Sequence, residues 1–430
     1  MEQYKIEARP LGEYQVIVLG GGVAGVCAAV TAARQGAKVL LCEAMGCLGG
    51  TMTQGLVPQM LDAENKGGLV REFYDALNAK GMTCPRQGAR VTPEGKKLCG
   101  ALIDVEGAKV YFDTLCQEAG VEVLLYTRVV HAEVHAGRIR GVVLATECGN
   151  FFATGQVFVE ATGNGALAAM VGLEWEIGKP DTGEVQPASM SVQVVGLPSD
   201  YNDTSTGDDK TAYANMLREH GITVSSDQVA VMRLPSLKTW LYSANFSYHV
   251  RPEDPFKLTR STMDGRKECL ETVRKQAQID GYSALWAVDG CEHIGLREGR
   301  RVRGKYRLTL EDILSGARFE DAVCTVRANI DIHKLNTGDT VGTARGYRTR
   351  PYHIPYRCLL PQGVENLLLA GRVMSGDFYA HASYRMMGDM SATGEAAGWA
   401  AAKCLEVDID PAQVNGVEVS NFMRSRGYEI

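Results

Sequence analysis

The chain has 430 residues, 45% of them hydrophobic, and a formal net charge of −6 at pH 7, so it can bury the core of two domains and offers no basic face to a nucleic-acid backbone. Residues 1–14 lack the apolar run of a signal peptide, and no later stretch approaches the ~20 consecutive apolar residues of a membrane span. We therefore expect a cytoplasmic protein with neither nucleic acid nor a membrane as a partner.

The N-terminal part of the chain predicts a strand, a tight turn, a helix and a second strand. Residues 14–19 are rich in β-branched side chains, an alanine-rich stretch follows from Ala24 with no helix breaker before Gly36, and residues 39–42 form another short apolar run. Further on, residues 121–130 and 137–146 are predicted as strands joined through HAEVHAG. Residues 155–163 are predicted as a strand that ends in a glycine turn.

The middle of the chain differs from its two ends. Residues 175–350 are more polar and irregular, with helical patterns at 261–279 and 309–319, whereas 364–372 predict a buried strand that meets a glycine and 388–403 a helix of small residues. The pattern predicts an α/β fold whose nucleotide-binding domain is assembled from residues 1–175 and 350–430. A substrate or cap domain of α+β type is inserted at 176–349, and part of 55–105 is a further candidate for the cap.

The glycines after the first strand carry the most specific local signal. Gly20, Gly22 and Gly25 give G-x-G-x-x-G between a strand and a helix: the first makes the turn, the second lets the backbone approach a pyrophosphate, and the third lets the helix pack on the strand. Backbone N–H groups at the helix start then face the phosphates. Glu43 ends the second strand, where a carboxylate accepts hydrogen bonds from a ribose 2′-hydroxyl. The motif predicts dinucleotide binding.

FAD and NAD share this fingerprint, and other segments decide between them. These are LGGT (48–51), VFVEATGNGALAAMVG (157–172), HIGLREGRRVRGKYRLTLEDIL (293–314), IPYRCLLPQGVENLLLAGR (354–372) and HASYRMMGDMSATGEAAG (381–398). With these segments in this order, the chain resembles the FAD-dependent oxidoreductase family of two-dinucleotide-binding-domain flavoproteins, whose FAD domain is similar to that of glutathione reductase. The resemblance implies FAD as the cofactor and a Rossmann-like FAD-binding domain, a parallel sheet with a β-meander.

The residues that the motif and the resemblance assign to FAD lie at strand ends and in the loop at 48–51. They are Gly20, Gly22, Val23, Ala24, Gly25, Glu43, Ala44, Gly49, Gly50, Thr51, Val129, Ala161, Thr162, Gly163, Gly371, Arg372 and Gly388. The helix beginning near Gly388 is expected to direct its positive N-terminal dipole at the flavin N1–C2=O edge. The plainer alternative is that these segments are only the sheet-to-helix turns of an α/β core.

The LGGT loop raises the question of a redox dithiol. In disulfide reductases GGT is followed by Cys, four residues and a second Cys, but those places here hold Met52 and Val57. Cys42 and Cys47 form a C-x-x-x-x-C upstream, where Cys42 ends a buried strand and is interpreted as core packing; a contact of Cys47 with the cofactor stays open. The 12 cysteines form no C-x-x-C pair or C/H cluster, so we expect no metal and no disulfide framework.

The leading hypothesis for the function is an FAD-dependent dehydrogenase or reductase that exchanges hydride between flavin N5 and a small organic substrate. No second G-x-G-x-x-G follows a strand, so a separate NAD(P)H domain is not expected. Any of several arginines could bind an anionic substrate through a carboxylate, although an arginine of this kind is more often a surface charge or part of an internal salt bridge. These are Arg297, Arg300, Arg301, Arg303, Arg345, Arg348, Arg350, Arg372 and Arg385.

Two other functions stay in view. One is a flavin monooxygenase that uses NAD(P)H, and the other is a flavoprotein that serves as the electron-transfer subunit of a larger complex. The electron donor or acceptor, the direction of the reaction and the oligomeric state, a homo-oligomer included, stay open at this point.

His381 and Arg385 are the predicted catalytic residues. The segment that holds them links Gly371 to the helix near Gly388, both expected at the flavin, and is too short to leave it. Histidine has an ordinary pKa of ~6.5, which suits proton transfer near neutrality, and arginine supplies a permanent positive charge for a substrate anion or the reduced flavin. Alternatively, His381 only hydrogen-bonds within a buried turn and another side chain carries the proton, the candidates being Tyr379, Tyr384, His293 and His353.

Overall fold

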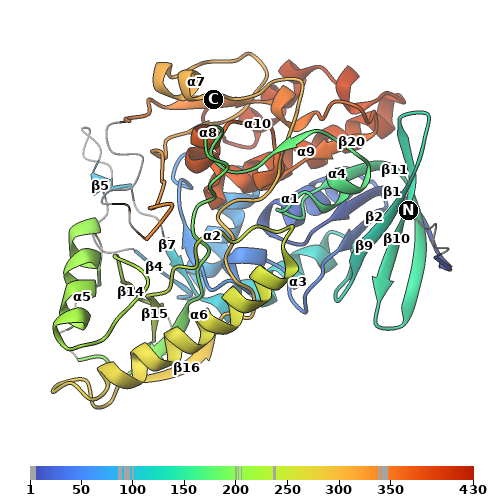
Figure 1. Cartoon of the computed structure of the whole chain (residues 1–430). Coiled ribbons are helices and arrows are strands. Elements are labelled where there is room, and N and C mark those ends of the chain that lie inside the picture. Colours follow the sequence, from blue (N-terminus) through green and yellow to red (C-terminus); the bar gives the residue numbers. More distant parts are fainter. Residues whose placement is uncertain are drawn as a thin grey trace.

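The structure is a computed structural model of the whole chain. The residues that it describes are 6–85, 90–91, 97–98, 101–198, 201, 203–204, 206–235, 239–337, 339 and 347–430. A sheet flanked by helices forms one part of the molecule, and a smaller antiparallel sheet with two helices lies at the opposite side (Figure 1). In the described part of the chain, no helix combines the length and the apolar character that crossing a membrane requires.

The main sheet has the order β8-β2-β1-β11-β10-β9, with β20 paired to β11. Its β1, β2, β8, β11 and β20 run parallel, whereas β9, β10 and β11 form an antiparallel meander, which confirms the predicted fold class. The strands are β1 (Arg9–Leu19), β2 (Val39–Cys42), β8 (Glu122–Leu124), β9 (Arg128–His135), β10 (Arg138–Thr146), β11 (Gly149–Glu160) and β20 (Leu367–Leu369).

The prediction of a single strand at 121–130 is wrong. The chain forms two strands there, β8 on one edge of the sheet and β9 on the other. Tyr126, between them, has a left-handed φ of +52°, and its N–H donates to Met45 O (N···O 3.1 Å). The apolar run continues across this break because both strands place side chains in the core, so the sequence pattern does not reveal it.

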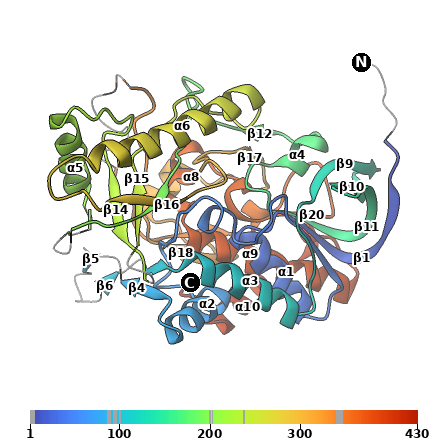
Figure 2. The same ribbon diagram turned by 90° about the horizontal axis from the view of Figure 1, so that it is seen from below.

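Helices α1 (Val23–Arg34) and α9 (Met387–Val407) cross each other almost backbone to backbone. A Cβ on Gly394 would lie 2.0 Å from Ala24 O, and one on Gly398 would lie 2.2 Å from Ala28 O, so only glycine fits at either place. This close approach explains the small residues of α9. Helices α2 (Gly68–Ala79), α3 (Val105–Glu118) and α10 (Gly416–Ser425) pack beside this pair (Figure 2).

The middle of the chain forms an antiparallel sheet of order β14-β15-β13-β16 with α5 (Gly207–Glu219) and α6 (Pro255–Gln276) beside it (Figure 1). Its strands are β13 (Val192–Val195), β14 (Ala230–Arg233), β15 (Trp240–Ser243) and β16 (Trp286–Gly290). The apolar side chains of residues 188–296 form a second core that also receives Leu56, Leu102 and Val105. We propose that this second core marks the substrate domain; side chains of residues 302–335 pack in the first core.

Short elements connect these layers. The helices are α4 (Ala166–Met170), α7 (Leu310–Ser315) and α8 (Phe378–Tyr384), and 3₁₀ turns occur at Gly50–Met52, Tyr356–Leu359, Gly371–Val373 and Pro411–Gln413. The small sheets pair β3 (Gln59–Met60) and β4 (Thr83–Pro85) with β7 (Ala101–Ile103), β5 (Arg90–Val91) with β6 (Lys97–Leu98), β12 (Trp175–Glu176) with β17 (Arg301–Val302), and β18 (Ala322–Val326) with β19 (Tyr352–Pro355).

Candidate functional site

In the glycine turn between β1 and α1, two glycines have no room for a side chain, whereas the third, Gly22, borders open space. A Cβ on Gly20 (φ +103°) would lie 2.4 Å from Ala161 O, and one on Gly25 would lie 1.8 Å from Gly20 O. At Gly22 the only atom that an added Cβ would meet within 4 Å is Gly50 Cα, at 3.9 Å. Gly22 is also the N-cap of α1 and provides no side-chain cap. The space beside Gly22 and the helix start therefore suits a phosphate group.

Glu43 lies just after β2, next to the same turn. The N–H of Gly21 donates to its Oε2 (2.7 Å) and the N–H of Met45 donates to its Oε1 (2.9 Å), so the backbone on both sides fixes the buried carboxylate. Each carboxylate oxygen has a second lone pair for a ribose hydroxyl. The N–H of Thr127 donates to the Glu43 carbonyl oxygen (2.8 Å), which brings the start of β9, and with it Val129, toward this end of the sheet.

The LGGT loop lies directly against the glycine turn. The N–H of Gly49 donates to Gly21 O (2.8 Å), and a Cβ on Gly50 would lie 2.9 Å from Gly22 Cα. Thr51, which follows, is exposed. The loop is braced from within, because the Thr53 hydroxyl donates to Leu48 O (2.6 Å).

The cysteines near this loop are free thiols. Cys42 is buried at the end of β2, and burial raises the pKa of its thiol. Cys47 is partly buried, and burial also raises its pKa; its Sγ lies 3.8 Å from Thr53 Oγ1. A raised pKa keeps a thiol protonated and a poor nucleophile at neutral pH.

The turn at the end of β11 places Arg372 beside residues predicted to bind the nucleotide. The chain turns at Ala161, Thr162 and Gly163, and a Cβ on Gly163 (φ +74°) would lie 2.7 Å from Arg372 Nη2. Glu160, which the sequence analysis missed, fixes this turn by accepting from Thr162 N (2.8 Å) and Ala168 N (3.1 Å). The signal that could have revealed it is an acidic residue at the carboxyl end of a buried strand.

Gly371 joins this turn to α1 and α9. The N–H of Gly371 donates to Thr393 Oγ1 (2.9 Å), and a Cβ on Gly371 (φ +80°) would lie 3.1 Å from the Cβ of Ala24. The carboxyl ends of β1, β11 and β20 therefore meet at the start of α1, the edge at which parallel sheets bind nucleotides.

The first turn of α9 faces the segment 61–66. The N–H of Gly388 donates to Leu61 O (3.1 Å), and a Cβ on Gly388 would lie 2.2 Å from Asp62 O. The N–H of Gly388, at the helix start whose dipole is predicted to face the flavin edge, thus bonds to a carbonyl oxygen of this segment.

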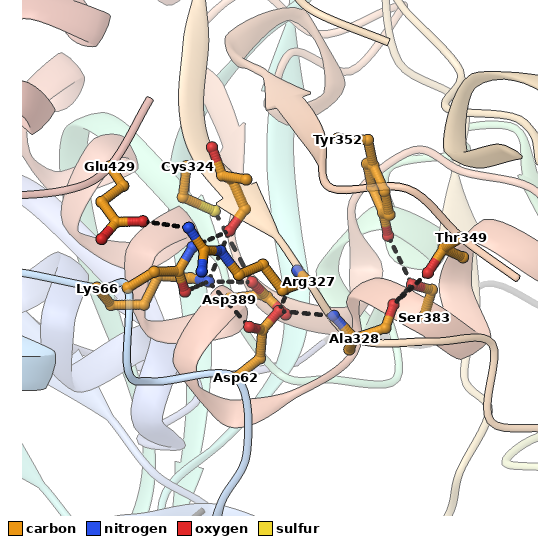
Figure 3. A network of polar contacts seen from close by, with 12 residues as sticks. Asp62, Lys66, Cys324, Arg327, Ala328, Thr349, Tyr352, Ser383, Asp389 and Glu429 are labelled. Atoms are coloured by element: carbon orange, nitrogen blue, oxygen red, sulfur yellow. Dashed lines mark hydrogen bonds and ion pairs between the residues drawn. The ribbon is translucent and has the colours of Figure 1, made fainter. Parts of the chain in front are cut away.

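A buried ionic network anchors the same segment (Figure 3). Lys66 Nζ lies 2.9 Å from Asp389 Oδ1 and 3.6 Å from Asp62 Oδ1, and it donates to Thr325 O (2.8 Å). Burial is the largest influence on the pKa of Lys66 and lowers it, but the charges of Asp389 and Asp62 outweigh it and raise the pKa. Burial, and then Asp62, raises the pKa of Asp389, whose Oδ2 has no hydrogen-bond partner among the described residues.

His381 lies on α8, a buried helix that the sequence analysis did not predict. Its side chain is fully buried, packs edge-on to Tyr384 with ring centroids 5.5 Å apart, and has no hydrogen-bond partner among the described residues at either ring nitrogen. Burial, and then the charges of three arginines, holds the pKa of His381 well below its ordinary value; these are Arg301, Arg385 and Arg372. The imidazole is therefore neutral at pH 7, with one N–H and one lone pair unused.

The other proton-transfer candidates are placed differently. Tyr384 is fully buried and its hydroxyl donates to Met374 O (3.1 Å), and His353 on β19 accepts from Phe319 N (3.1 Å). His293 and Tyr379 are partly buried.

Several predicted arginines have structural partners. Arg301 is fully buried and bonds Glu298 (2.9 Å), Gly178 O and Gly376 O. Arg303 lies 3.2 Å from Glu176, and Arg300 donates to Asn164 O (2.8 Å). Arg348 and Arg350 are exposed, and Arg345 lies outside the described residues.

Three candidate arginines remain. After burial, the charges of Arg385 and Arg372 lower the pKa of His381, and after burial the charge of Arg385 also lowers the pKa of Arg297. Arg372 Nη1 donates to Leu296 O. Near Arg372 and the turn at Gly163, two buried polar atoms lack a partner among the described residues, Asn164 Oδ1 and Arg300 Nε. Unpaired buried polar atoms are costly, so such a set marks a place where a polar ligand completes the structure. These atoms, together with the open space at Gly22, fit a dinucleotide.

The comparisons with known proteins agree with this geometry. The family model described as FAD dependent oxidoreductase matches residues 15–423. Digeranylgeranylglycerophospholipid reductase 2 from Methanothermobacter thermautotrophicus is 28% identical over 181 residues, which are 38% of this chain and 43% of that protein, so the match spans less than half of the relative.

Two solved structures show the same fold. A geranylgeranyl bacteriochlorophyll reductase-like protein from Thermoplasma acidophilum has a TM-score of 0.52 and 13% identity, with 96% of this chain and 84% of that chain covered. A triple mutant of the flavin-dependent brominase Bmp2 has a TM-score of 0.51 and 12% identity, with the same coverage of 96% and 84%.

Proposed function

Because the chain belongs to the FAD dependent oxidoreductase family, whose model matches residues 15–423, we propose that it is an FAD-dependent dehydrogenase or reductase of a small organic substrate. FAD is its cofactor, and when bound it supplies flavin N5 as the donor or acceptor of a hydride. The observation that carries the proposal is the turn at Gly22, where the protein leaves space for a phosphate between tightly packed glycines.

The residues that would hold the dinucleotide come from three places. The start of α1 at Val23 offers its N–H groups to the phosphates, and Glu43 offers its remaining lone pairs to the ribose. The turn at Gly163 with Arg372 lies beside them and supplies a positive charge.

We assign proton transfer to His381. A neutral imidazole can accept a proton at one nitrogen while it donates at the other. Burial, and then the neighbouring guanidiniums, lowers the pKa of His381 and keeps the imidazole neutral before the reaction, and its burial also keeps bulk water away from the proton. Arg385, which follows α8, would hold an anionic group of the substrate.

Anaerobic mixing of the yellow holoprotein with a panel of small organic compounds tests the proposal. A compound that bleaches the visible absorption of the oxidised flavin identifies the reductive half-reaction. Bleaching by NADPH that is accelerated by an aromatic compound would instead indicate a monooxygenase. Protein that neither contains FAD nor takes it up would refute the proposal.

A further inference from the structure

The surroundings of His381 contain more positive charge than negative charge. Arg301 is paired with Glu298, and Arg385 with Asp331. Among the described residues, no carboxylate forms an ion pair with Arg297 or Arg372. Burial, and then the charge of Arg385, lowers the pKa of each of these two arginines to about 10. Two unpaired guanidiniums in a partly buried place indicate that an anion is missing.

Arg297 is held from one side only. Its Nη1 donates to Pro187 O (2.5 Å) and Ser189 Oγ (3.1 Å), and its Cζ lies 4.9 Å above the centre of the Phe246 ring. No described residue accepts a hydrogen bond from its Nε or Nη2. The residue is partly buried, and this free edge keeps unused donors.

Arg385 is fixed in a similar way. Its Nη2 donates to both Asp331 O and Asp331 Oδ2 (3.0 Å each), whereas its Nε is buried and without a partner among the described residues. Asp331 is half exposed, with 52% of its side chain accessible, and its Oδ2 lies 3.7 Å from His333 Nε2. His333 in turn packs edge-on to Phe246, with ring centroids 5.1 Å apart. Phe246 therefore supports both Arg297 and the Asp331–His333 pair.

We propose that the substrate is an organic carboxylate whose carboxylate group is bound by the unused donors of Arg297 and Arg385. Two fixed guanidiniums with unused donors provide the charge-assisted hydrogen bonds that a carboxylate accepts. The bound group would lie in the neighbourhood of His381, whose pKa responds to the charge of Arg385. The inference rests on the proposed function, because it names the class of substrate for that same site.

A cofactor phosphate is the other source of an anion at these arginines. Arg372 suits that role, because it lies against Gly163 in the nucleotide-binding turn. Arg297 differs, since it is anchored on residues 187–189, where Ala188 packs in the second core. Arg372 Nη1 also donates to Leu296 O, and Leu296 packs in the second core, so Arg372 joins the Gly163 turn to that core, whereas Arg297 bonds to residues 187–189.

The test titrates the FAD-loaded protein with acetate, pyruvate, succinate and benzoate, and with acetamide, succinamide and benzamide as neutral controls, while the flavin absorption spectrum is recorded. We expect at least one carboxylate to shift the spectrum and its amide not to. In Arg297→Met and Arg385→Met, FAD should be retained and the Kd of that carboxylate should rise about ten- to hundred-fold. Arg297→Lys, which keeps the positive charge, should raise the Kd of the carboxylate less than Arg297→Met does.

Arg357→Met is the matched control. Arg357 bonds Asp321 (2.9 Å) and has 47% of its side chain exposed, so this variant is expected to leave the Kd unchanged. The inference is overturned if no carboxylate shifts the spectrum, or if both methionine variants bind it as wild type does. It is also overturned if these variants lose FAD while Arg357→Met keeps it, because the arginines then serve the cofactor. Wild-type protein that binds no FAD refutes the proposed function itself and is recognised before any titration.

Discussion

Replacing Lys66 by methionine should destabilise the protein far more than the loss of an ordinary lysine. The substitution keeps the length of the side chain and removes the ammonium that lies 2.9 Å from Asp389 Oδ1 and 3.6 Å from Asp62 Oδ1. Lys66 and Asp389 have no exposed side-chain area and Asp62 has 5%, so two carboxylates would remain buried without a cation. Breaking a buried ion pair in this way costs about 3–5 kcal/mol.

This free energy corresponds to a measurable change in melting temperature. With an unfolding entropy of about 2.1 cal/mol/K per residue, 430 residues give ~0.9 kcal/mol/K, so we expect Tm to fall by about 3–6 °C in calorimetry. Lys267→Met is the matched control, because Lys267 is 74% exposed and lies 3.8 Å from Glu271. A surface pair of this kind contributes at most about 0.5 kcal/mol.

The stability that Lys66→Met loses should depend on pH. Burial, and then Asp62, raises the pKa of Asp389 in the folded protein, and removal of Lys66 raises it further. A carboxyl group whose pKa is raised in the folded state stabilises the fold at pH values below ~3.9, its pKa in the unfolded state. This contribution is lost as the pH rises through the pKa of the folded state. Lys66→Met should therefore lose more stability at about pH 8 than at about pH 5.

A second variant tests the cause. Lys66→Met combined with Asp389→Asn removes the unpaired charge together with its partner, so the double variant should be more stable than Lys66→Met alone. A Tm for Lys66→Met within 1 °C of that of the Lys267→Met control, or an even lower Tm for the double variant, would refute the reasoning.

The site provides three further predictions. Gly22→Val should purify with little FAD, as measured by the ratio of 450 to 280 nm absorbance, because its side chain fills the space for the pyrophosphate; full occupancy would contradict this role. Replacing Cys42 and Cys47 together by serine should leave flavin reduction by substrate nearly unchanged, since both thiols are free and have raised pKa values; a large loss of activity would restore the dithiol hypothesis. His381→Ala should keep FAD but slow flavin reduction in stopped flow by ~100-fold or more, and reduction at the wild-type rate would exclude His381 as the proton carrier.

The sequence by itself determined the elements whose geometry is local. The turn at Gly20, Gly22 and Gly25 requires only a strand, three glycines and a helix start within a few residues, and the structure forms it in that way. The sequence also predicted a helix of small residues at 388–403, and the structure packs its Gly394 and Gly398 against α1. The order of the family's segments along the chain was sufficient to identify FAD.

The tertiary structure decided which charged residues are available for chemistry. Nine arginines were candidates, and their neighbours in the sequence did not distinguish Arg301, which Glu298, Gly178 and Gly376 satisfy, from Arg297, which keeps a free edge. The tertiary structure also determined where the strands break near Tyr126 and that His381 is buried on a helix.

The reason is that a buried charge is stabilised by partners that the chain path brings from far away. Lys66 meets Asp389 and the carbonyl of Thr325, which lies 259 residues further along the chain. An apolar periodicity shows that a segment is buried but not which polar group it meets there, because that depends on how every other segment packs. The sequence therefore identified the cofactor, and the tertiary structure decided which side chains are free to act beside it.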